Sequence, residues 1–451
     1  MFESLRKIIT LEIFIFILLI MTSYTIMKIS PSLLDFNLPD SESYINSSAD
    51  RSAIYPTFLY ILELARIDVV NIQILILSIS LSYLCMTLIQ LNKKYFFIIL
   101  FFLAISLNIY YTSFAKTILP ECILFSFINF AFSILLKKKK EIIHFIILGI
   151  SLGFIISIKK IGIVIALIFF FIFFLQLNKE RFKRNLFLII APLILIISAE
   201  NILFFKKHSK RSSVFVYTII GKLLLISGNK DFNSNNYDPK YKELLNYSGQ
   251  YFKRVNLFLN SIDDIFLKAE LLSDYETIAQ YQFLRFDQVK QFQITVNNHF
   301  KKDKNEILFR MIKYNLSDLL ELSFYHYIGM WSAGSKQIYL NLNSISPPYY
   351  DNLKKSSGGV NKIDINIIKT VNKLFIILMY LSLSGIFFLL IKKSLIKKTV
   401  LSCFFISQFY ITSVSFVNLS TLRYLMPVYS IIIFQALIMA DYMYRRIRKN
   451  L

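Results

Sequence analysis

Residues 187–205 read Phe-Leu-Ile-Ile-Ala-Pro-Leu-Ile-Leu-Ile-Ile-Ser-Ala-Glu-Asn-Ile-Leu-Phe-Phe, an almost unbroken apolar run. A helix of this length crosses the hydrocarbon core of a bilayer, which is about 30 Å thick. Similar blocks occupy residues 8–29 and 374–391. None of them alternates apolar with polar residues, as the strands of a membrane barrel would. Helices are therefore the spanning structure that the pattern predicts.

The composition of the whole chain agrees with these blocks. Hydrophobic residues make up 55% of the 451 residues and charged residues only 18%, whereas a soluble domain carries about 25% charged residues. The predicted fold class is all-α, a polytopic transmembrane helix bundle. The block at 8–29 is longer than the apolar core of a signal peptide and lacks a cleavage site, so we interpret it as a retained first span.

The net charge of +23 has two interpretations, nucleic-acid binding and membrane topology. Lysines and arginines cluster just beyond the ends of apolar blocks, for example at 137–140 and 392–398. This is the pattern of the positive-inside rule and of contact with anionic membrane lipids, so we predict no nucleic-acid partner. The three cysteines lie far apart and lack metal-ligand spacing, which favours small buried residues.

The basic clusters predict about ten spans, possibly 11 or 12, with the N-terminus inside. The predicted spans are 8–29, 69–91, 95–111, 118–136, 142–158, 161–177, 186–205, 370–391, 399–416 and 424–444. The basic patch at 206–211 then lies outside, in a long segment where the rule has little force.

Three parts of the chain follow from this topology. We expect an N-terminal transmembrane catalytic module at 1–205 with an outer loop at 30–68, and a C-terminal transmembrane module at 368–451. Between them, 206–367 is polar and is predicted to be an outward-facing, mostly helical soluble or interfacial domain. Its apolar stretch 319–331 is interpreted as a re-entrant, interfacial or additional spanning helix.

The outer loop holds the densest group of chemically active side chains. These are two carboxylates, an arginine and two tyrosines, namely Asp40, Glu42, Arg51, Tyr44 and Tyr55. Judged on the residues alone, an ordinary solvated polar loop is favoured over a catalytic site.

The order of residues in this loop resembles a known family. Pro-Asp-Ser-x-x-Tyr at 39–44, then Arg51, then Tyr-Pro-x-Phe-Leu at 55–59, is similar to the first outer loop of the C-type (GT-C fold) membrane glycosyltransferases. The resemblance extends to protein mannosyltransferases and the lipid A aminoarabinose transferase. The chain departs from the family pattern in a shorter spacer and in Ala53, which stands where the family has proline.

Later residues support the same resemblance, which covers about 1–205 and 370–451. Glu121 opens the predicted fourth span, where the family has a second outer acidic site. Lys159 and Lys160 stand between the fifth and sixth spans, at the family's basic position. Arg423, in Leu-Arg-Tyr-Leu-Met-Pro at 422–427, resembles the arginine-tyrosine-proline entry to a late span.

The resemblance implies transfer of a sugar from a polyprenyl-phosphate donor to a glycan, lipid or protein acceptor at the outer face. Asp40 would be the general base of an inverting reaction, with Glu42 as the second candidate. The donor phosphate would meet Lys159, Lys160, Arg51 and Arg423, and substrate would meet Tyr44, Tyr55 and Glu121. A divalent metal ion remains open as a cofactor, because some relatives use one. The implied location is the inner membrane of a bacterium, with the site facing the periplasm.

Alternatives remain at two levels. Lys159 and Lys160 could extend to the membrane interface, Arg423 could anchor a span, and the carboxylate of Glu121 suits the positive end of a helix. The whole chain could be a flippase or transporter of a lipid-linked oligosaccharide, or a polymerase or ligase of surface polysaccharide that uses a polyprenyl-diphosphate donor. Transporters place essential charges near the bilayer midplane, whereas the candidates here lie at the outer ends of spans, so the enzyme is favoured.

Overall fold

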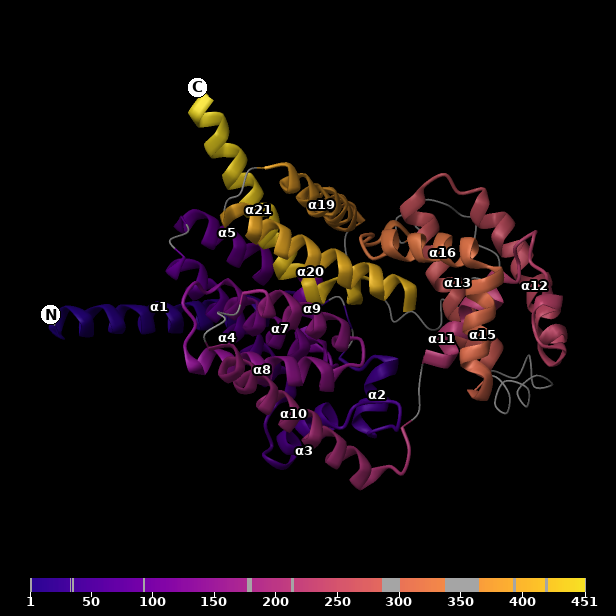
Figure 1. The fold of residues 1–451 in the computed structure, drawn as a ribbon, viewed down its shortest axis with the longest axis horizontal. Coiled ribbons are helices and arrows are strands. Elements are labelled where there is room, and N and C mark those ends of the chain that lie inside the picture. Colours follow the sequence, from indigo (N-terminus) through magenta and orange to yellow (C-terminus); the bar gives the residue numbers. More distant parts are fainter. Residues whose placement is uncertain are drawn as a thin grey trace. The chain divides into compact units, whose positions relative to one another are not determined.

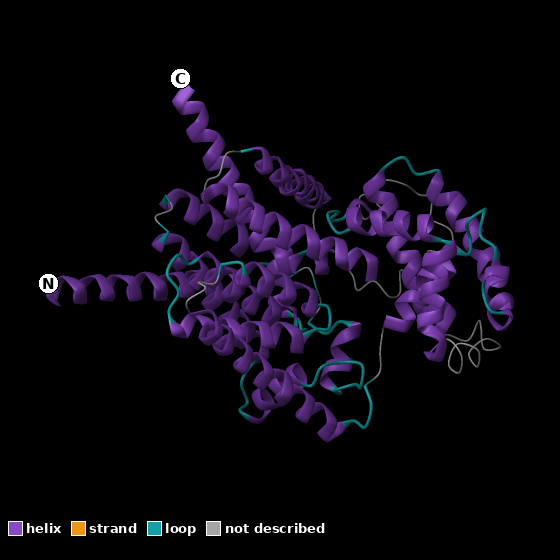
Figure 2. Cartoon of the chain, viewed as in Figure 1, coloured by secondary structure: helices purple, strands orange, loops and turns teal. Residues whose placement is uncertain are grey.

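The computed structural model describes residues 2–32, 34, 36–91, 94–176, 181–211, 215–285, 301–336, 365–391, 395–417 and 421–450. Every regular element in these ranges is a helix (Figure 2). The chain forms two compact units. Unit 1 comprises Met1–Arg211, Leu381–Tyr410 and Met426–Leu451, and unit 2 comprises Ser212–Tyr380 and Ile411–Leu425.

Unit 1 contains helices from both the N-terminal and the C-terminal apolar parts of the chain (Figure 1). They are α1 (Phe2–Ile29), α2 (Pro39–Ile45), α3 (Ile54–Leu64), α4 (Val69–Gln90), α5 (Tyr95–Ser106), α6 (Ile109–Ser113), η1 (Phe114–Lys116), α7 (Glu121–Leu136), α8 (Ile142–Ile158), α9 (Gly162–Phe174), α10 (Phe182–Lys207), η6 (Gly385–Leu390) and α21 (Met426–Asn450). Two further helices, α19 (Ile365–Ser384) and α20 (Leu395–Val417), are shared with unit 2.

Each predicted span overlaps at least one helix, with 95–111 divided between α5 and α6, but not all of these helices are long enough to cross a bilayer. Six in the described part of the chain are: Leu11–Ile29, Val69–Gln90, Phe182–Lys207, Asn366–Leu390, Ile396–Val417 and Met426–Arg448. The pair α5 and α6–η1, bent by 54°, makes a seventh if it is one span. Helices α7, α8 and α9 have 16, 17 and 13 residues. The multi-pass helical architecture is thus confirmed, while ten crossings and a GT-C core stay predictions.

Small residues let α8 and α10 pack closely. A Cβ at Gly149 would lie 2.2 Å from the carbonyl oxygen of Ile189, and one at Gly153 would lie 2.8 Å from the Cβ of Ile196. Glycines four residues apart form one face of a helix, so the two backbones approach along a line. This contact fixes α10 beside the end of α8, where the candidate site lies.

A buried amide joins four helical elements inside unit 1. Asn129 Nδ2 on α7 donates to Tyr111 Oη (3.2 Å) on α6 and to Ser80 Oγ (3.3 Å) on α4. Ser430 Oγ on α21 donates to Asn129 Oδ1 at 2.8 Å. Such bonds stabilise helix association where hydrocarbon offers no other partner to polar groups.

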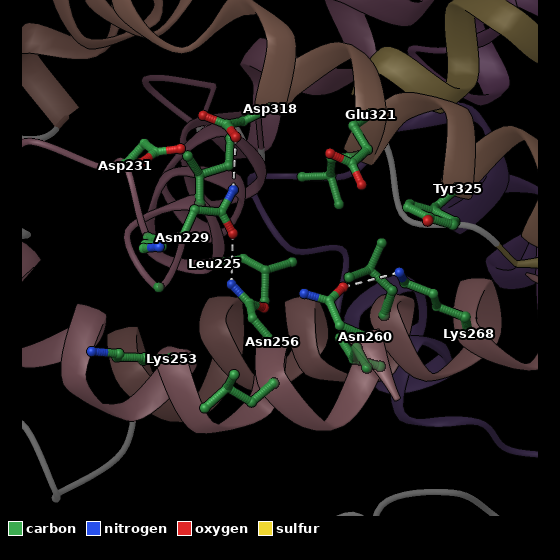
Figure 3. Close-up of a pocket in the computed structure, with 17 residues that line it drawn as sticks. Leu225, Asn229, Asp231, Lys253, Asn256, Asn260, Lys268, Asp318, Glu321 and Tyr325 are labelled. Carbon is green, nitrogen blue, oxygen red and sulfur yellow. Dashed lines mark hydrogen bonds between the residues drawn. The ribbon is translucent and has the colours of Figure 1, made fainter. Parts of the chain in front are cut away.

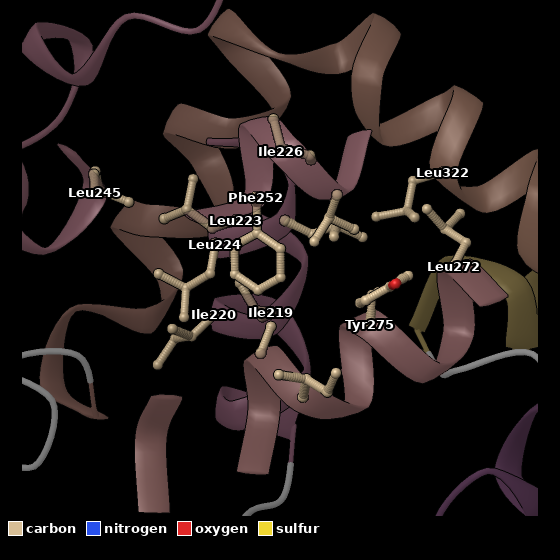
Figure 4. Close-up of a cluster of buried hydrophobic side chains, with 14 of the residues drawn as sticks. Ile219, Ile220, Leu223, Leu224, Ile226, Leu245, Phe252, Leu272, Tyr275 and Leu322 are labelled. Atoms are coloured by element: carbon tan, nitrogen blue, oxygen red, sulfur yellow. The ribbon is translucent and has the colours of Figure 1, made fainter. Parts of the chain in front are cut away.

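Unit 2 has its own core. Its other helices are α11 (Phe215–Ile226), η3 (Ser234–Asn236), α12 (Pro239–Asn260), α13 (Ile265–Arg285), α15 (Lys301–Tyr314), α16 (Leu316–Gly329) and η7 (Leu422–Tyr424). Apolar side chains of α11 meet Phe252 of α12, Tyr275 of α13 and Leu322 of α16 (Figure 4). Helix α11 is apolar around most of its circumference, which explains its central place.

The stretch 319–331 belongs to this core. Leu319 and Leu322 are members of the buried cluster, and Trp331 is fully buried. Helix α16 has only 14 residues and is not among the candidate spans of the described chain. Helix α16 is thus not a candidate span, while a re-entrant or interfacial position stays a prediction, because Leu320 and Phe324 on the same helix are exposed.

Candidate active site

The predicted outer loop forms two short helices, α2 and α3, around a turn. Helix α2 begins at Pro39, where the Ser41 hydroxyl accepts a hydrogen bond from the Leu38 amide (2.9 Å). Three hydrogen bonds join the segment to the ends of α8 and α10: Ser52 Oγ to the Ile158 carbonyl (3.1 Å), Ala53 N to Glu200 Oε1 (3.2 Å), and His208 Nε2 to the Ser47 carbonyl (2.6 Å). The loop is therefore fixed against the helical bundle.

Asp40 lies beside a well-oriented arginine. Arg51 Nη2 donates to Asp40 Oδ1 at 2.7 Å, and Arg51 Nε donates to Ser43 Oγ at 2.8 Å. The guanidinium carbon is 4.8 Å from the centre of the Tyr44 ring, and Asp50 lies 3.8 Å from Arg51 Nε. The Asp40 side chain retains 33% exposure, so a substrate can reach the carboxylate.

A second carboxylate and arginine flank this pair. Glu200 is buried on α10; it accepts a hydrogen bond from Arg211 Nη2, which also donates to Asn201 Oδ1 at 2.9 Å. The Arg211 guanidinium lies 4.3 Å from the centre of the Phe204 ring. The basic patch that the topology placed outside thus supplies a cation that is fixed in unit 1.

Lys160 lies among these charges. Its side chain is exposed, and partial desolvation lowers its pKa, as do the nearby guanidinium groups of Arg211 and Arg51. The carboxylates of Asp50 and Glu200 act in the opposite direction. Because Lys160 is close to two guanidinium groups, an incoming anion would stabilise its charged form. We refer to Asp40, Arg51, Lys160, Glu200 and Arg211 as the Asp40 cluster.

Glu121 and Lys159 form a more deeply placed ion pair. Lys159 Nζ lies 2.6 Å from Glu121 Oε1, with side-chain exposures of 14% and 0%. Tyr55 is close enough to interact with Glu121 and Tyr44, and its hydroxyl donates to Gln73 Oε1 at 2.8 Å. The rings of Tyr44 and Tyr55 meet edge to face at 5.4 Å. Both rings are buried, so their contacts here are with the protein.

Two predicted site residues are not part of this connected set. Glu42 is exposed on α2, next to the cluster in sequence but outside the contacts that define it. Arg423 is on η7, in unit 2, so its grouping with Asp40 remains a prediction. The structure brings the other seven predicted residues into the connected set just described.

Sequence reasoning missed Glu200 and Arg211. A signal for Glu200 was present, since it is the one carboxylate in the apolar run 187–205. An ionisable residue within a span marks a functional site by default. Arg211 gave no such signal, because its patch looked like part of a long polar segment.

The divalent metal ion that the resemblance left open stays a prediction. No group of three or more histidine, cysteine, aspartate or glutamate side chains gathers among the described residues in a geometry that could hold one.

Comparisons with known proteins add no assignment to this geometry. No family model matches the chain, and no curated protein or solved structure is significantly similar to it.

Proposed function

We propose that this protein is a membrane glycosyltransferase that transfers a sugar from a polyprenyl-phosphate donor to an acceptor at the outer surface. One observation carries this function: a reachable carboxylate, Asp40, lies in one cluster with three cations, Arg51, Lys160 and Arg211. Sugar transfer from a phosphate needs a base for the acceptor proton and positive charge for the departing phosphate. Both are present within one set of contacts.

An apolar groove on α10 supports a lipid-linked donor. The groove has a volume of about 570 Å³ and runs along the helix from Phe187 to Ile202. Its end at Ile202 is within one turn of Glu200, the partner of Arg211. A polyprenyl chain in this groove would bring its phosphate to the cations of the Asp40 cluster. Arginine suits bidentate contact with phosphate, and lysine adds a point charge.

The chemical step then follows from the residues. The acceptor hydroxyl or amine attacks the anomeric carbon while Asp40 takes its proton. The bond between that carbon and the phosphate oxygen breaks, and the electron pair leaves with polyprenyl phosphate. Attack opposite the leaving group inverts the anomeric centre. Arg51, Lys160 and Arg211 stabilise the charge that develops on the phosphate.

The buried residues have a positioning role in this proposal. The Tyr44 ring packs against the guanidinium of Arg51, and the Tyr55 ring packs edge to face against Tyr44. The Glu121–Lys159 pair holds the turn that presents Lys160. These contacts fix the cations before the donor arrives, which is the condition for electrostatic catalysis.

The test is transfer from a radiolabelled polyprenyl-phosphate sugar in proteoliposomes. Asp40→Asn should lose about 10²- to 10⁴-fold in rate, the contribution of a general base. Glu42→Gln is the matched control, because it removes an exposed carboxylate two residues away on the same helix, and it should keep wild-type activity.

Full activity in Asp40→Asn would remove the base assignment. Failure with every monophosphate donor, combined with transport of a lipid-linked oligosaccharide, would assign the chain to the flippases instead. Activity only with diphosphate donors would indicate a polysaccharide polymerase or ligase.

A further inference from the structure

Unit 2 contains an open cleft that the proposed reaction does not use. Its volume is about 370 Å³, within the range of small-molecule sites. Helices α12 and α16 face each other across it, with Asn256 and Asn260 on one side and Asp318 and Tyr325 on the other (Figure 3). We call it the α12–α16 cleft.

The loop that closes one end depends on a glycine. A Cβ on Gly228 would lie 2.5 Å from the carbonyl carbon of Phe252, in the backbone of α12. The loop can therefore lie directly against α12, which brings Asn229 and Asp231 to the cleft wall. A side chain at position 228 would push the loop away from this wall.

Amide and carboxylate groups at this end are held by one another. Asn256 Nδ2 donates to Asn229 Oδ1 (2.7 Å), and Asn229 Nδ2 donates to Asp318 Oδ1 (2.8 Å). Asp318 also accepts from Asn315 Nδ2 at 3.2 Å. The chain of bonds fixes which atoms donate and which accept, so a ligand would meet polar groups of defined direction.

The other end combines an aromatic ring with a lysine. Lys268 Nζ donates to Asn260 Oδ1 at 3.1 Å and lies 4.8 Å from the centre of the Tyr325 ring. Leucines from the core of unit 2, among them Leu259, Leu272 and Leu322, also line the cleft. The cleft thus presents both directed polar groups and apolar surface.

The charges that line the cleft balance. Its cations are Lys230, Lys253 and Lys268, and its carboxylates are Asp231, Asp318 and Glu321. An anion such as a phosphate would meet three carboxylates, and a cation would meet three lysines. A neutral ligand that both donates and accepts many hydrogen bonds avoids repulsion by charges of like sign in either case.

We propose that the α12–α16 cleft binds a short, neutral oligosaccharide. Sugar hydroxyl groups both donate and accept, which suits the asparagine and carboxylate pairs, and the apolar face of a sugar ring suits the leucines and Tyr325. Oligosaccharide binding at this cleft does not require the reaction at Asp40. Only the role of the bound oligosaccharide, as the acceptor glycan, rests on the proposed function.

The test measures binding to the full chain in nanodiscs, by saturation-transfer NMR and calorimetry. The probes are maltotriose, mannotriose and tri-N-acetylchitotriose, with 3′-sialyllactose and inorganic phosphate as charged comparisons. At least one neutral trisaccharide should bind, and the charged probes should bind more weakly. Asn256→Ala and Asn260→Ala should each weaken that binding by about 3- to 10-fold, the effect of one or two neutral hydrogen bonds.

Asn246→Ala is the matched control, because Asn246 is an exposed asparagine on the same helix outside the cleft. It should bind like the wild type, as should Asp40→Asn. Thermal unfolding and circular dichroism establish that each variant folds.

Three results overturn the proposal: no neutral trisaccharide binds, the charged probes bind best, or the two cleft variants bind like Asn246→Ala. If the cleft fails but sugar transfer occurs, only this inference falls. If a glycan binds without any transfer activity, the glycosyltransferase proposal falls and the binding site stands.

Discussion

Unit 1 and unit 2 each contain a cluster of charged side chains, and the two differ in their access to solvent. In the Asp40 cluster, the side chains of Asp40 and Arg51 are 33% and 20% exposed. In unit 2, Glu276 Oε2 lies 3.3 Å from Lys222 Nζ and close to His326 Nε2 (2.5 Å), and all three residues are almost completely buried. We call the second group the Lys222 triad.

The difference bears on what each group of charges can do. A buried ion pair loses its hydration, and its attraction repays that loss only while both partners are present. The Lys222 triad joins α11, α13 and α16 inside the core, where no substrate can reach it. Asp40 and the three cations of its cluster keep exposed surface that ligands can approach, whereas Glu200 is buried. A cluster of charged residues is therefore a candidate catalytic site only where its groups are accessible to a substrate.

The largest expected effect is on the stability of unit 2. Glu276→Gln leaves the Lys222 ammonium buried without a counter-charge, and the free energy of unfolding should fall by about 3–5 kcal/mol. Thermal unfolding of the full chain in detergent, with hydrogen exchange of α11, measures this. Glu243→Gln, at an exposed site on α12, is the control and should change little.

A second variant sharpens this result. Replacing both charges, with Lys222→Met and Glu276→Gln, should recover most of the lost stability, because no unpaired ion remains. If Glu276→Gln alone were as stable as Glu243→Gln, the triad would be hydrated and the contrast with the Asp40 cluster would be lost.

The next effect concerns activity rather than stability. Arg51→Ala should lower kcat/KM for sugar transfer by about 10- to 150-fold, the value of a hydrogen bond to a charged group. Its thermal midpoint should change little, because partly exposed ion pairs contribute about 0–1 kcal/mol. Arg51→Lys should be intermediate, since lysine keeps the charge and loses the two-pronged geometry. Wild-type kinetics in Arg51→Ala would exclude Arg51 from the reaction.

A pH effect should distinguish the triad further. Burial, and then the Lys222 charge, lower the pKa of His326, while Glu276 opposes them. The unfolded chain therefore binds a proton near pH 6.5 that the folded chain does not. The contribution of His326 to the free energy of unfolding should be constant at higher pH and should decline as the pH falls below about 6.5. Unfolding midpoints between pH 7.5 and 5.5 should fall less in His326→Gln than in the wild type; equal slopes would contradict this.

The smallest effect is expected at Lys160. Because the pKa of Lys160 is lowered, its ammonium group loses its proton at a lower pH than an ordinary lysine does. Donor binding should therefore weaken as the pH rises through the pKa of Lys160. Lys160→Arg should bind the donor like the wild type near neutrality and retain affinity at more alkaline pH. The measurement is the pH profile of KM for the donor. Parallel profiles for the two proteins would remove Lys160 from phosphate binding.

Much of the fold could be predicted from sequence, and less of the site. Apolar runs such as 187–205 gave the helices because a helix satisfies its backbone hydrogen bonds within one segment. The bend of 54° between α5 and α6–η1 was not predicted. Asp40 and Arg51 were found together because 11 residues separate them in one loop. Glu200 was missed as their neighbour, since its contact with Ala53 spans 147 residues.

Local sequence was enough to predict a helical, apolar chain with segments long enough to cross a membrane, because the length and composition of each segment are local properties. Which charges meet, and which of them solvent can reach, became known from the three-dimensional fold. That fold brought Lys159 to Glu121 across 38 residues and buried Lys222 with Glu276 across 54. Pairing and burial depend on how separate helices pack, and helix packing depends on side-chain shape over the whole unit rather than on any one segment.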